Sequence, residues 1–217
     1  MTVGDLMGLI THNAPEFPKG CEWINTAKPL LLSKLSGNIV ILDFWTYCCI
    51  NCIHMTHVLA EIEKKYKDYP VVIIGVHSAK FENENNSKNI SEAISRYGIQ
   101  HPVVSDKEMR AWALFGVNAW PTMVIIGPAG RIEYKIAGEL SFEQLDQLLS
   151  GIIHDAKSAG TLARHKPRIS MRSQSRQSLL SYPGKISFSK DGSRFALSDS
   201  NHNRILIVNS CTCKRKD

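Results

Sequence analysis

The 217-residue sequence has no apolar run approaching the roughly 20 residues that a membrane-spanning helix needs. Its first residues, MTVGDLMGLITHNAPEF, have neither a basic n-region nor a sustained apolar h-region, so we see no secretory signal. We therefore expect a cytoplasmic protein with no membrane partner. In that compartment six cysteines do not favour a static disulfide framework, and a C-x-x-C favours redox catalysis or metal binding.

Acidic residues are scarce in the C-terminal quarter of the chain. Residues 157–217 hold 13 lysines and arginines but only three acids, a net charge of +10, whereas residues 1–156 have a net charge of −4. A basic segment of this kind can bind nucleic acid. This one has few aromatic residues for base stacking, namely Tyr182, Phe188 and Phe195, and no recognisable nucleic-acid motif. We interpret it as a solvated linker and the basic edge of an incomplete domain, and we expect no nucleic-acid partner.

Apolar runs alternate with amphipathic segments through the first three quarters of the chain. Near-continuous apolar runs at 38–45, 71–77 and 122–127 indicate strands that are buried on both faces of a sheet. The segments INCIHMTHVLAEIEKKYKDY and KNISEAISRYG have helical periodicity, and SFEQ at Ser141 matches a capping box that begins another helix. RIEYKIAG alternates like a hairpin partner. The pattern predicts an α/β fold with a mixed central sheet and flanking helices.

The composition changes in the last 60 or so residues. Residues 157–178 are rich in Ser and Arg with weak periodicity, and we expect a linker there. Residues 179–217 contain three strand-like runs, KISFS, RFALSD and RILIVN, separated by turn sequences, and then a basic tail with Cys211 and Cys213. One such meander buries too little surface to be stable alone. The expected domains are therefore 1–156, a linker, and a small C-terminal β-meander.

Three cysteines lie within WTYCCINC, at the junction between the first apolar run and the helix that follows it. Cys49 and Cys52 form a C-x-x-C, with Cys49 at about the helix N-cap and Cys52 one turn further on. Free backbone N–H groups and the helix dipole favour a thiolate at Cys49. A spacing of three brings Cys52 onto the same face, where it can resolve a mixed disulfide. The motif predicts thiol–disulfide exchange in which Cys49 attacks and Cys52 displaces the substrate.

The stretch ILDFWTYCCINC resembles the active-site segment of the thioredoxin family, in which a buried acid and aromatic residues precede the dithiol. The resemblance implies that Asp43 is the buried proton acceptor, Cys49 the nucleophile and Cys52 the resolving cysteine. It also implies that Trp120 and Pro121 form the cis-proline segment that lies beside the dithiol and presents backbone to the substrate. The expected substrate is a protein or small-molecule thiol or disulfide, and no cofactor is expected.

The insertion between residues 79 and 106 resembles the extra helix and strand of TlpA-like and peroxiredoxin-like thioredoxins. FWTYCCINC also resembles the thioredoxin domain of bacterial DipZ-type proteins. EWINT, GVHSAKF, HPVVSD, LLSYPGKI and SDSNHNRILIV look like segments of the NHL repeat-containing protein 2 family, whose members join a thioredoxin-like domain to an NHL β-propeller. This resemblance implies that residues 179–217 are one incomplete propeller blade, and that the propeller part has protein partners.

Two alternatives to catalysis stay open. In the first, the dithiol is unused and the thioredoxin-like and propeller parts form a scaffold for protein–protein interaction. In the second, Cys48 and Cys52 share a helix face at a spacing of four and bind copper or zinc, with His77 or His101 as an additional ligand. Cys48 stands where thioredoxins have Trp, so it is a substrate-side residue, a third redox thiol or a packed small hydrophobe. Trp120 is either a docking aromatic or a packing residue.

Overall fold

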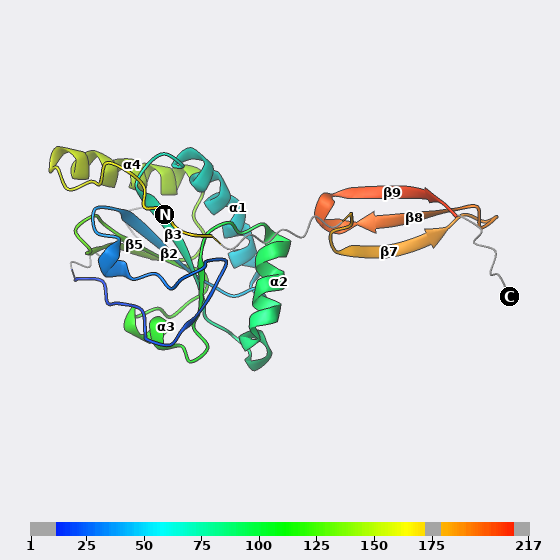
Figure 1. Cartoon of the computed structure of the whole chain (residues 1–217), viewed down its shortest axis with the longest axis horizontal. Helices are drawn as coiled ribbons and strands as arrows, with labels where there is room; N and C mark the ends of the chain where they lie inside the picture. The colour runs from blue at the N-terminus through cyan, green and yellow to red at the C-terminus, as the bar shows by residue number, and fades with distance from the viewer. Residues whose placement is uncertain (1–11, 172–178, 211–217) are drawn as a thin grey trace. The chain divides into compact units, whose positions relative to one another are not determined.

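The computed structural model describes residues 12–171 and 179–210. The chain divides into two compact units between residues 174 and 175. Figure 1 shows the first unit as a layered α/β structure and the second as a small sheet. Each unit is described by itself below.

The first unit is built on a six-stranded mixed sheet with the strand order β1-β4-β3-β2-β5-β6. Strand β3 pairs in parallel with both β2 and β4, and the other neighbouring pairs are antiparallel. The strands are β1 (Glu22–Ile24), β2 (Ile39–Trp45), β3 (Val71–His77), β4 (Val103–Ser105), β5 (Thr122–Ile126) and β6 (Ile132–Ala137). The mixed sheet predicted from the sequence is confirmed. The edge strand β1 was not predicted, because three residues are too few to show an alternating pattern.

Helices cover both faces of this sheet. They are α1 (Ile50–Lys65), α2 (Ser87–Tyr97), α3 (Arg110–Leu114) and α4 (Phe142–Ser158), with 3-10 turns η2 (Leu32–Lys34) and η3 (Glu82–Asn85). Helices α1 and α4 lie over one face of the sheet and α3 over the other (Figure 1). The predicted capping box is present at the start of α4, where Ser141 and Gln144 each accept a backbone N–H from the other. Helix α2 ends at Gly98 in the left-handed conformation, as its sequence predicted.

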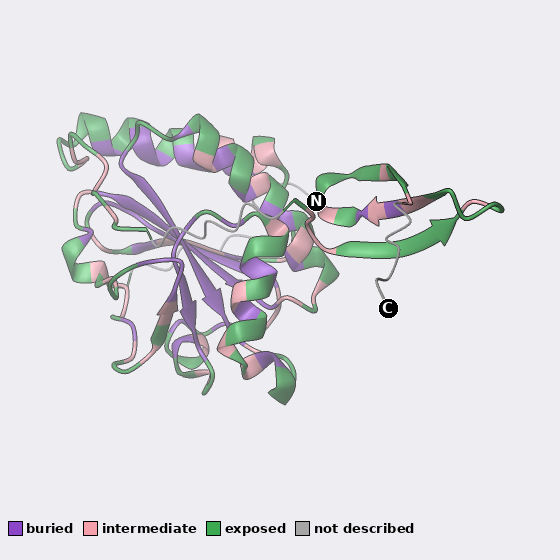
Figure 2. Cartoon of the chain, turned by 45° about the vertical axis from the view of Figure 1, so that its right-hand side comes forward, coloured by how far each residue is buried: buried purple, intermediate pink, exposed green. Residues whose placement is uncertain are grey.

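The core of the first unit lies on both faces of β2 and β3, in which every residue is buried. Figure 2 shows these strands as the buried centre of the unit. One apolar cluster joins the sheet to α1 and α4, and a second joins it to α3 and the segment before β2. A third, smaller cluster joins α2 to Trp45 and Cys52 at the carboxyl end of β2. This third cluster is where the predicted dithiol lies.

The basic segment after α4 runs back along the first unit as far as the structure describes it. The Ala163 N–H donates to the Gly37 carbonyl at 2.7 Å, and the Ala27 N–H donates to the Ser170 carbonyl at 2.8 Å. Leu162 and Ile169 pack against the two large apolar clusters. Residues up to 171 therefore belong physically to the first unit, while the expected domain boundaries remain a prediction.

The second unit is an antiparallel meander in the order β7-β8-β9, which fits the expected partial blade. Its strands are β7 (Pro183–Phe188), β8 (Arg194–Asp199) and β9 (Arg204–Asn209), with the 3-10 turn η4 (Ser200–His202). Most of its residues are exposed (Figure 2). Cys211 and Cys213 lie outside the described residues. Across residues 12–171 and 179–210, no helix is long and apolar enough to cross a membrane.

Candidate active site

The three clustered cysteines lie where β2 gives way to α1. Strand β2 ends at Trp45, and Cys49 is the N-cap of α1, as the sequence predicted. The Cys49 N–H donates to the Thr46 carbonyl at 3.2 Å, and the Cys49 carbonyl accepts the first helical hydrogen bond from Ile53. The turn leaves Cys48 exposed, Cys49 partly buried and Cys52 buried. Access to the pair is therefore through Cys49.

Cys49 and Cys52 are both free thiols, and their side chains are hydrogen-bonded to each other. Cys52 is fully buried, and this burial is the largest cause of its raised pKa. The hydrogen bond with Cys49 and the negative charge of Asp43 raise the pKa of Cys52 further. Cys52 is thus held as a neutral thiol at neutral pH, and it needs a base before it can attack a disulfide.

Asp43 is the buried acid nearest to that thiol along β2. It lies between Gly75 of β3 and Met123 of β5, and only 2% of it is exposed. Its Oδ1 has no hydrogen-bond partner among the described residues. Burial raises the pKa of Asp43 to about 7, against the opposing effect of the nearby His101. Both protonation states are therefore populated near neutral pH, which is what a proton acceptor for Cys52 requires.

Trp120 and Pro121 lie beside the pair, joined by a cis peptide bond. The Trp120 indole packs in the same apolar cluster as Cys49 and Cys52. Its Nε1 donates to the Ser78 carbonyl at 2.9 Å, and its ring lies 4.3 Å from the Trp112 ring between centroids. Trp120 is only partly buried, so it both packs and leaves surface next to Cys49.

Asp106 positions this aromatic pair, and the sequence reasoning missed it. Its carboxylate accepts hydrogen bonds from the Ala111 and Trp112 N–H groups, each at 2.9 Å, and from Ser78 Oγ at 3.0 Å. Asp106 is 1% exposed, so these bonds lie away from water. Asp106 lies four residues before Arg110, where α3 begins, and so does not occupy the N-cap position that the usual sequence signal marks.

Glu84, which was also missed, lies behind Cys48. It is fully buried within η3, and its Oε2 accepts from Thr46 Oγ1 at 2.6 Å and from the Lys80 N–H at 2.7 Å. Burial, followed by the interaction with this carboxylate, raises the pKa of Cys48 to about 11. Although exposed, Cys48 is therefore a neutral thiol at neutral pH and a poorer nucleophile than a thiolate. In the sequence, Glu84 looks like one of several polar loop residues.

The two histidines considered as metal ligands are buried separately. His77 is 1% exposed, lies parallel to the Tyr47 ring at 5.4 Å, and has a pKa lowered to about 4 by burial. His101 instead pairs through Nδ1 with Glu63 at 3.2 Å. Within the described ranges, no group of three or more His, Cys, Asp or Glu residues is arranged to hold a metal ion. The geometry gives the copper or zinc alternative no support there.

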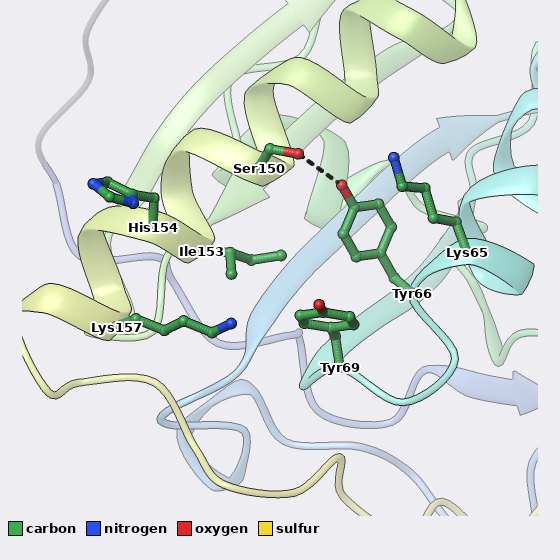
Figure 3. Close-up of a pocket in the computed structure, with 7 residues that line it drawn as sticks. All are labelled: Lys65, Tyr66, Tyr69, Ser150, Ile153, His154 and Lys157. Carbon is green, nitrogen blue, oxygen red and sulfur yellow. Dashed lines mark hydrogen bonds between the residues drawn. The ribbon is translucent and has the colours of Figure 1, made fainter.

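A cavity of about 420 Å³ lies elsewhere, between the C-terminal ends of α1 and α4 (Figure 3). Tyr66 and Ser150 are hydrogen-bonded across it at 3.1 Å, and the Lys157 Nζ lies 5.2 Å from the Tyr69 ring centroid. Its lining contains none of the site residues predicted from the sequence and no thiol. The lining residues are Lys65, Tyr66, Tyr69, Ser150, Ile153, His154 and Lys157.

Several known proteins are similar to this chain in sequence. A family model described as thioredoxin-like matches residues 37–132. NHL repeat-containing protein 2 of Bos taurus is 43% identical over 89% of this chain and 27% of its own length. Thiol-disulfide oxidoreductase ResA of Bacillus anthracis is 32% identical over 58% of this chain and 69% of its own length. Protein DipZ of Mycobacterium tuberculosis is 30% identical over 66% of this chain and 21% of its own length.

Solved structures show the same fold at lower identity. A thiol:disulfide interchange protein of the thioredoxin family from Chlorobium tepidum superposes with a TM-score of 0.57 at 19% identity, covering 67% of this chain and 99% of that one. The present chain spans only about a quarter of the length of the bovine NHL repeat-containing relative.

Proposed function

Because this chain belongs to the thioredoxin-like family, we propose that it exchanges thiols and disulfides through Cys49 and Cys52. The observation that carries the proposal is the hydrogen-bonded pair of free thiols at the start of α1, with the buried carboxyl of Asp43 close to Cys52. An accessible thiol, a buried thiol and a buried base are the three groups that the reaction needs.

The proposed reaction has two steps. The Cys49 thiolate attacks one sulfur of a substrate disulfide, forms a mixed disulfide and releases the first substrate thiol. Asp43 then takes the Cys52 proton, and the Cys52 thiolate attacks the Cys49 sulfur and releases the second substrate thiol. The substrate disulfide is reduced by two electrons, and the protein dithiol becomes a Cys49–Cys52 disulfide. The reverse sequence oxidises a substrate dithiol.

Three residues are proposed to meet the substrate around Cys49. Trp120 supplies a partly exposed indole face, and Pro121 supplies backbone next to the pair. Cys48 supplies an exposed neutral thiol on the other side of Cys49. The substrate itself is proposed to be a protein or small-molecule thiol or disulfide, and the cytoplasmic location expected from the sequence remains a prediction.

Trapping of the mixed disulfide tests this function. In Cys52→Ser the second step cannot occur, so a disulfide substrate should remain covalently attached through Cys49 and be released by dithiothreitol. Cys49→Ser should trap nothing, and Cys21→Ser serves as the matched control because Cys21 packs in another cluster and both reacting sulfurs stay in place. Mass spectrometry of the trapped species identifies the attached cysteine. Failure of Cys52→Ser to form any adduct, while the folded protein is intact, would sink the proposal.

A scaffold role is the second candidate, and the second unit favours it. Ile186, Phe188, Ile205 and Ile207 are each more than half exposed on its small sheet. The bovine relative named for NHL repeats extends well beyond the matched region. If scaffolding is the whole function, Cys49→Ser should leave the set of captured protein partners and the cellular phenotype unchanged.

A further inference from the structure

A buried polar cluster lies on the side of Asp43 that the proposed exchange reaction does not use. Asp43 Oδ1, Trp45 Nε1 and His101 Nε2 are buried and have no hydrogen-bond partner among the described residues. A buried polar atom without a hydrogen-bond partner destabilises the fold. Three such atoms gathered at one reactive carboxyl therefore call for an explanation.

The three side chains meet at Gly75. Asp43 is the direct partner of Gly75 across the parallel β2–β3 pair. A Cβ built on Gly75 would lie 3.0 Å from Trp45 Nε1 and 3.5 Å from His101 Nε2. Any side chain at position 75 would therefore push the indole and the imidazole away, and glycine lets both nitrogens approach the backbone beside Asp43.

The backbone around His101 is fixed on both sides. The Asn25 side-chain amide donates to the carbonyls of Ile99 at 3.1 Å and of His101 at 2.9 Å. The next carbonyl, that of Pro102, accepts from the Gly75 N–H at 2.9 Å. His101 is only 5% exposed, so the surrounding protein holds its ring in this position.

The other ring nitrogen of His101 leads towards solvent. Its Nδ1 lies 3.2 Å from Glu63 Oε1, and the Glu63 side chain is 24% exposed. Glu63 follows Cys52 by eleven residues, which is three turns of α1, so the two lie along the same face of that helix. A neutral imidazole with Nδ1–H directed at a carboxylate presents Nε2 as an acceptor to the core, where Asp43 lies.

We propose that His101 and Glu63 carry to solvent the proton that Asp43 takes from Cys52, an inference that rests on the proposed function. Protonated Asp43 gives its proton to His101 Nε2, and His101 gives the Nδ1 proton to Glu63, which exchanges it with water. The unpaired atoms are one N–H donor, on Trp45, and two acceptors, on Asp43 and His101. A single buried water can bridge all three. Asp43 is then a carboxylate again and ready for another turnover.

Other charged groups near the path are few within the described residues. Cys52 of α1 interacts with Asp43 and with Cys49, and Lys166, from the segment after α4, lies near Glu63. Asp68 also lies near Lys166, so the same lysine interacts with both carboxylates.

The test separates the two chemical steps in the full chain with its other four cysteines changed. An excess of dithiobis(nitrobenzoate) releases one coloured thiolate when Cys49 attacks and a second when Cys52 resolves the mixed disulfide. His101→Gln should leave the first phase within about twofold and slow the second by about tenfold or more at low buffer concentration. Added imidazole should restore the second phase and should not change the first. The parent chain carries C21S, C48S, C211S and C213S, and a chain that keeps Cys48 is run beside it, because Cys48 is itself proposed to meet the substrate.

Two further variants complete the experiment. Glu63→Gln should slow the second phase without loss of folding, because its amide keeps a partner for His101 but accepts no proton. His54→Gln is the matched control, since His54 makes a similar contact with Glu139, at 3.1 Å, on the exposed side of α1. It should leave both phases unchanged.

The outcomes distinguish the relay from the function on which it rests. A parent chain without a first phase would contradict the proposed function, and the relay with it. A parent chain that shows both phases leaves the proposed function standing. The relay alone is overturned if folded His101→Gln and Glu63→Gln both have a second phase that matches the parent between about pH 6 and pH 9. A slow second phase that added imidazole does not restore also overturns the relay, because a purely structural defect would behave in this way.

Discussion

Asp43 and His77 are buried ionisable residues on adjacent strands, and burial shifts their pKa values in opposite directions. It raises the pKa of Asp43 to about 7 and lowers that of His77 to about 4. Each residue therefore resists taking its charged form inside the protein. Between about pH 4 and pH 7 the two contributions to the free energy of unfolding therefore change in opposite directions and largely offset each other.

Asp43→Asn should remove the contribution to stability that is lost as the pH rises. The folded state holds the Asp43 proton more tightly than the unfolded state, so this residue favours folding below about pH 4 and loses that contribution as the pH rises through about 7. The stability advantage of Asp43→Asn over the parent should grow by about 4 kcal/mol between these limits. Urea unfolding across that pH range measures it. A difference that does not change with pH would show that Asp43 is not buried as described.

His77→Phe should remove the contribution to stability that is lost as the pH falls. The unfolded state binds the His77 proton more tightly, so its contribution is present above about pH 6.5 and is lost as the pH falls to about 4. The stability of His77→Phe relative to the parent should therefore rise by about 3 kcal/mol as the pH falls over this interval. The phenylalanine ring preserves packing against Tyr47, and no hydrogen bond is lost because both ring nitrogens lack a partner among the described residues. Parallel losses in the two proteins would contradict this.

At the level of residues, the sequence predicted the dithiol, Asp43 and the neighbouring Trp120, but not the carboxylates of Glu63 and Glu84. Cys49 and Cys52 are recognisable because their spacing and their place after a strand are local features. Glu84 hydrogen-bonds to Thr46 across 38 residues, and Glu63 and His101 are also 38 residues apart. Such contacts depend on how strands and helices pack, and no local pattern carries that information.

At the level of elements, the short helix α3 depends on one carboxylate. Asp106 binds the N–H groups of Ala111 and Trp112, and Trp112 packs against Trp120 beside the dithiol. A helix of five residues has too few internal hydrogen bonds to be stable without such a partner.

Asp106→Ala should therefore destabilise the protein by about 2 to 4 kcal/mol, because it leaves buried donors unpaired. It should also change tryptophan fluorescence, since the Trp112–Trp120 pair is released. Glu108→Ala, on the same loop with a side chain 72% exposed, should change the free energy of unfolding by less than about 0.5 kcal/mol. Equal effects of the two substitutions would show that the Asp106 contacts do not stabilise α3.

The elements were predictable where the pattern was long or carried a clear end signal. The buried runs of β2, β3 and β5 and the capping box of α4 were recognised for that reason. The strand β1 and the turn η3 were not, because three or four residues carry no period. Both are fixed by contacts with the rest of the sheet and with Thr46.

At the level of the whole molecule, the two units differ in how much they bury. The first has three apolar clusters, whereas in the second Leu197 is the one apolar residue that is buried among those described. A lone three-stranded meander with one buried apolar side chain falls short of independent stability.

A chain that ends at Gln174 should therefore keep the free energy of unfolding of the first unit within about 0.5 kcal/mol and keep the reactivity of Cys49. Residues 175–217 alone should show no cooperative transition by circular dichroism. Addition of the next segment of a longer homologue, which supplies neighbouring blade surface, should restore one. Cooperative unfolding of 175–217 by itself would contradict the expected incomplete blade.

The carboxylate of Glu84 connects the insertion between residues 79 and 106 to the loop that carries the cysteines. Its side chain accepts hydrogen bonds from Thr46 Oγ1 and from the Lys80 N–H. After burial, it is also what raises the pKa of Cys48. The CCINC sequence by itself therefore does not carry the surroundings of Cys48 into another protein. In a thioredoxin that lacks the insertion, the same five residues would have no counterpart of Glu84 beside the first cysteine, and the pKa of that cysteine would differ.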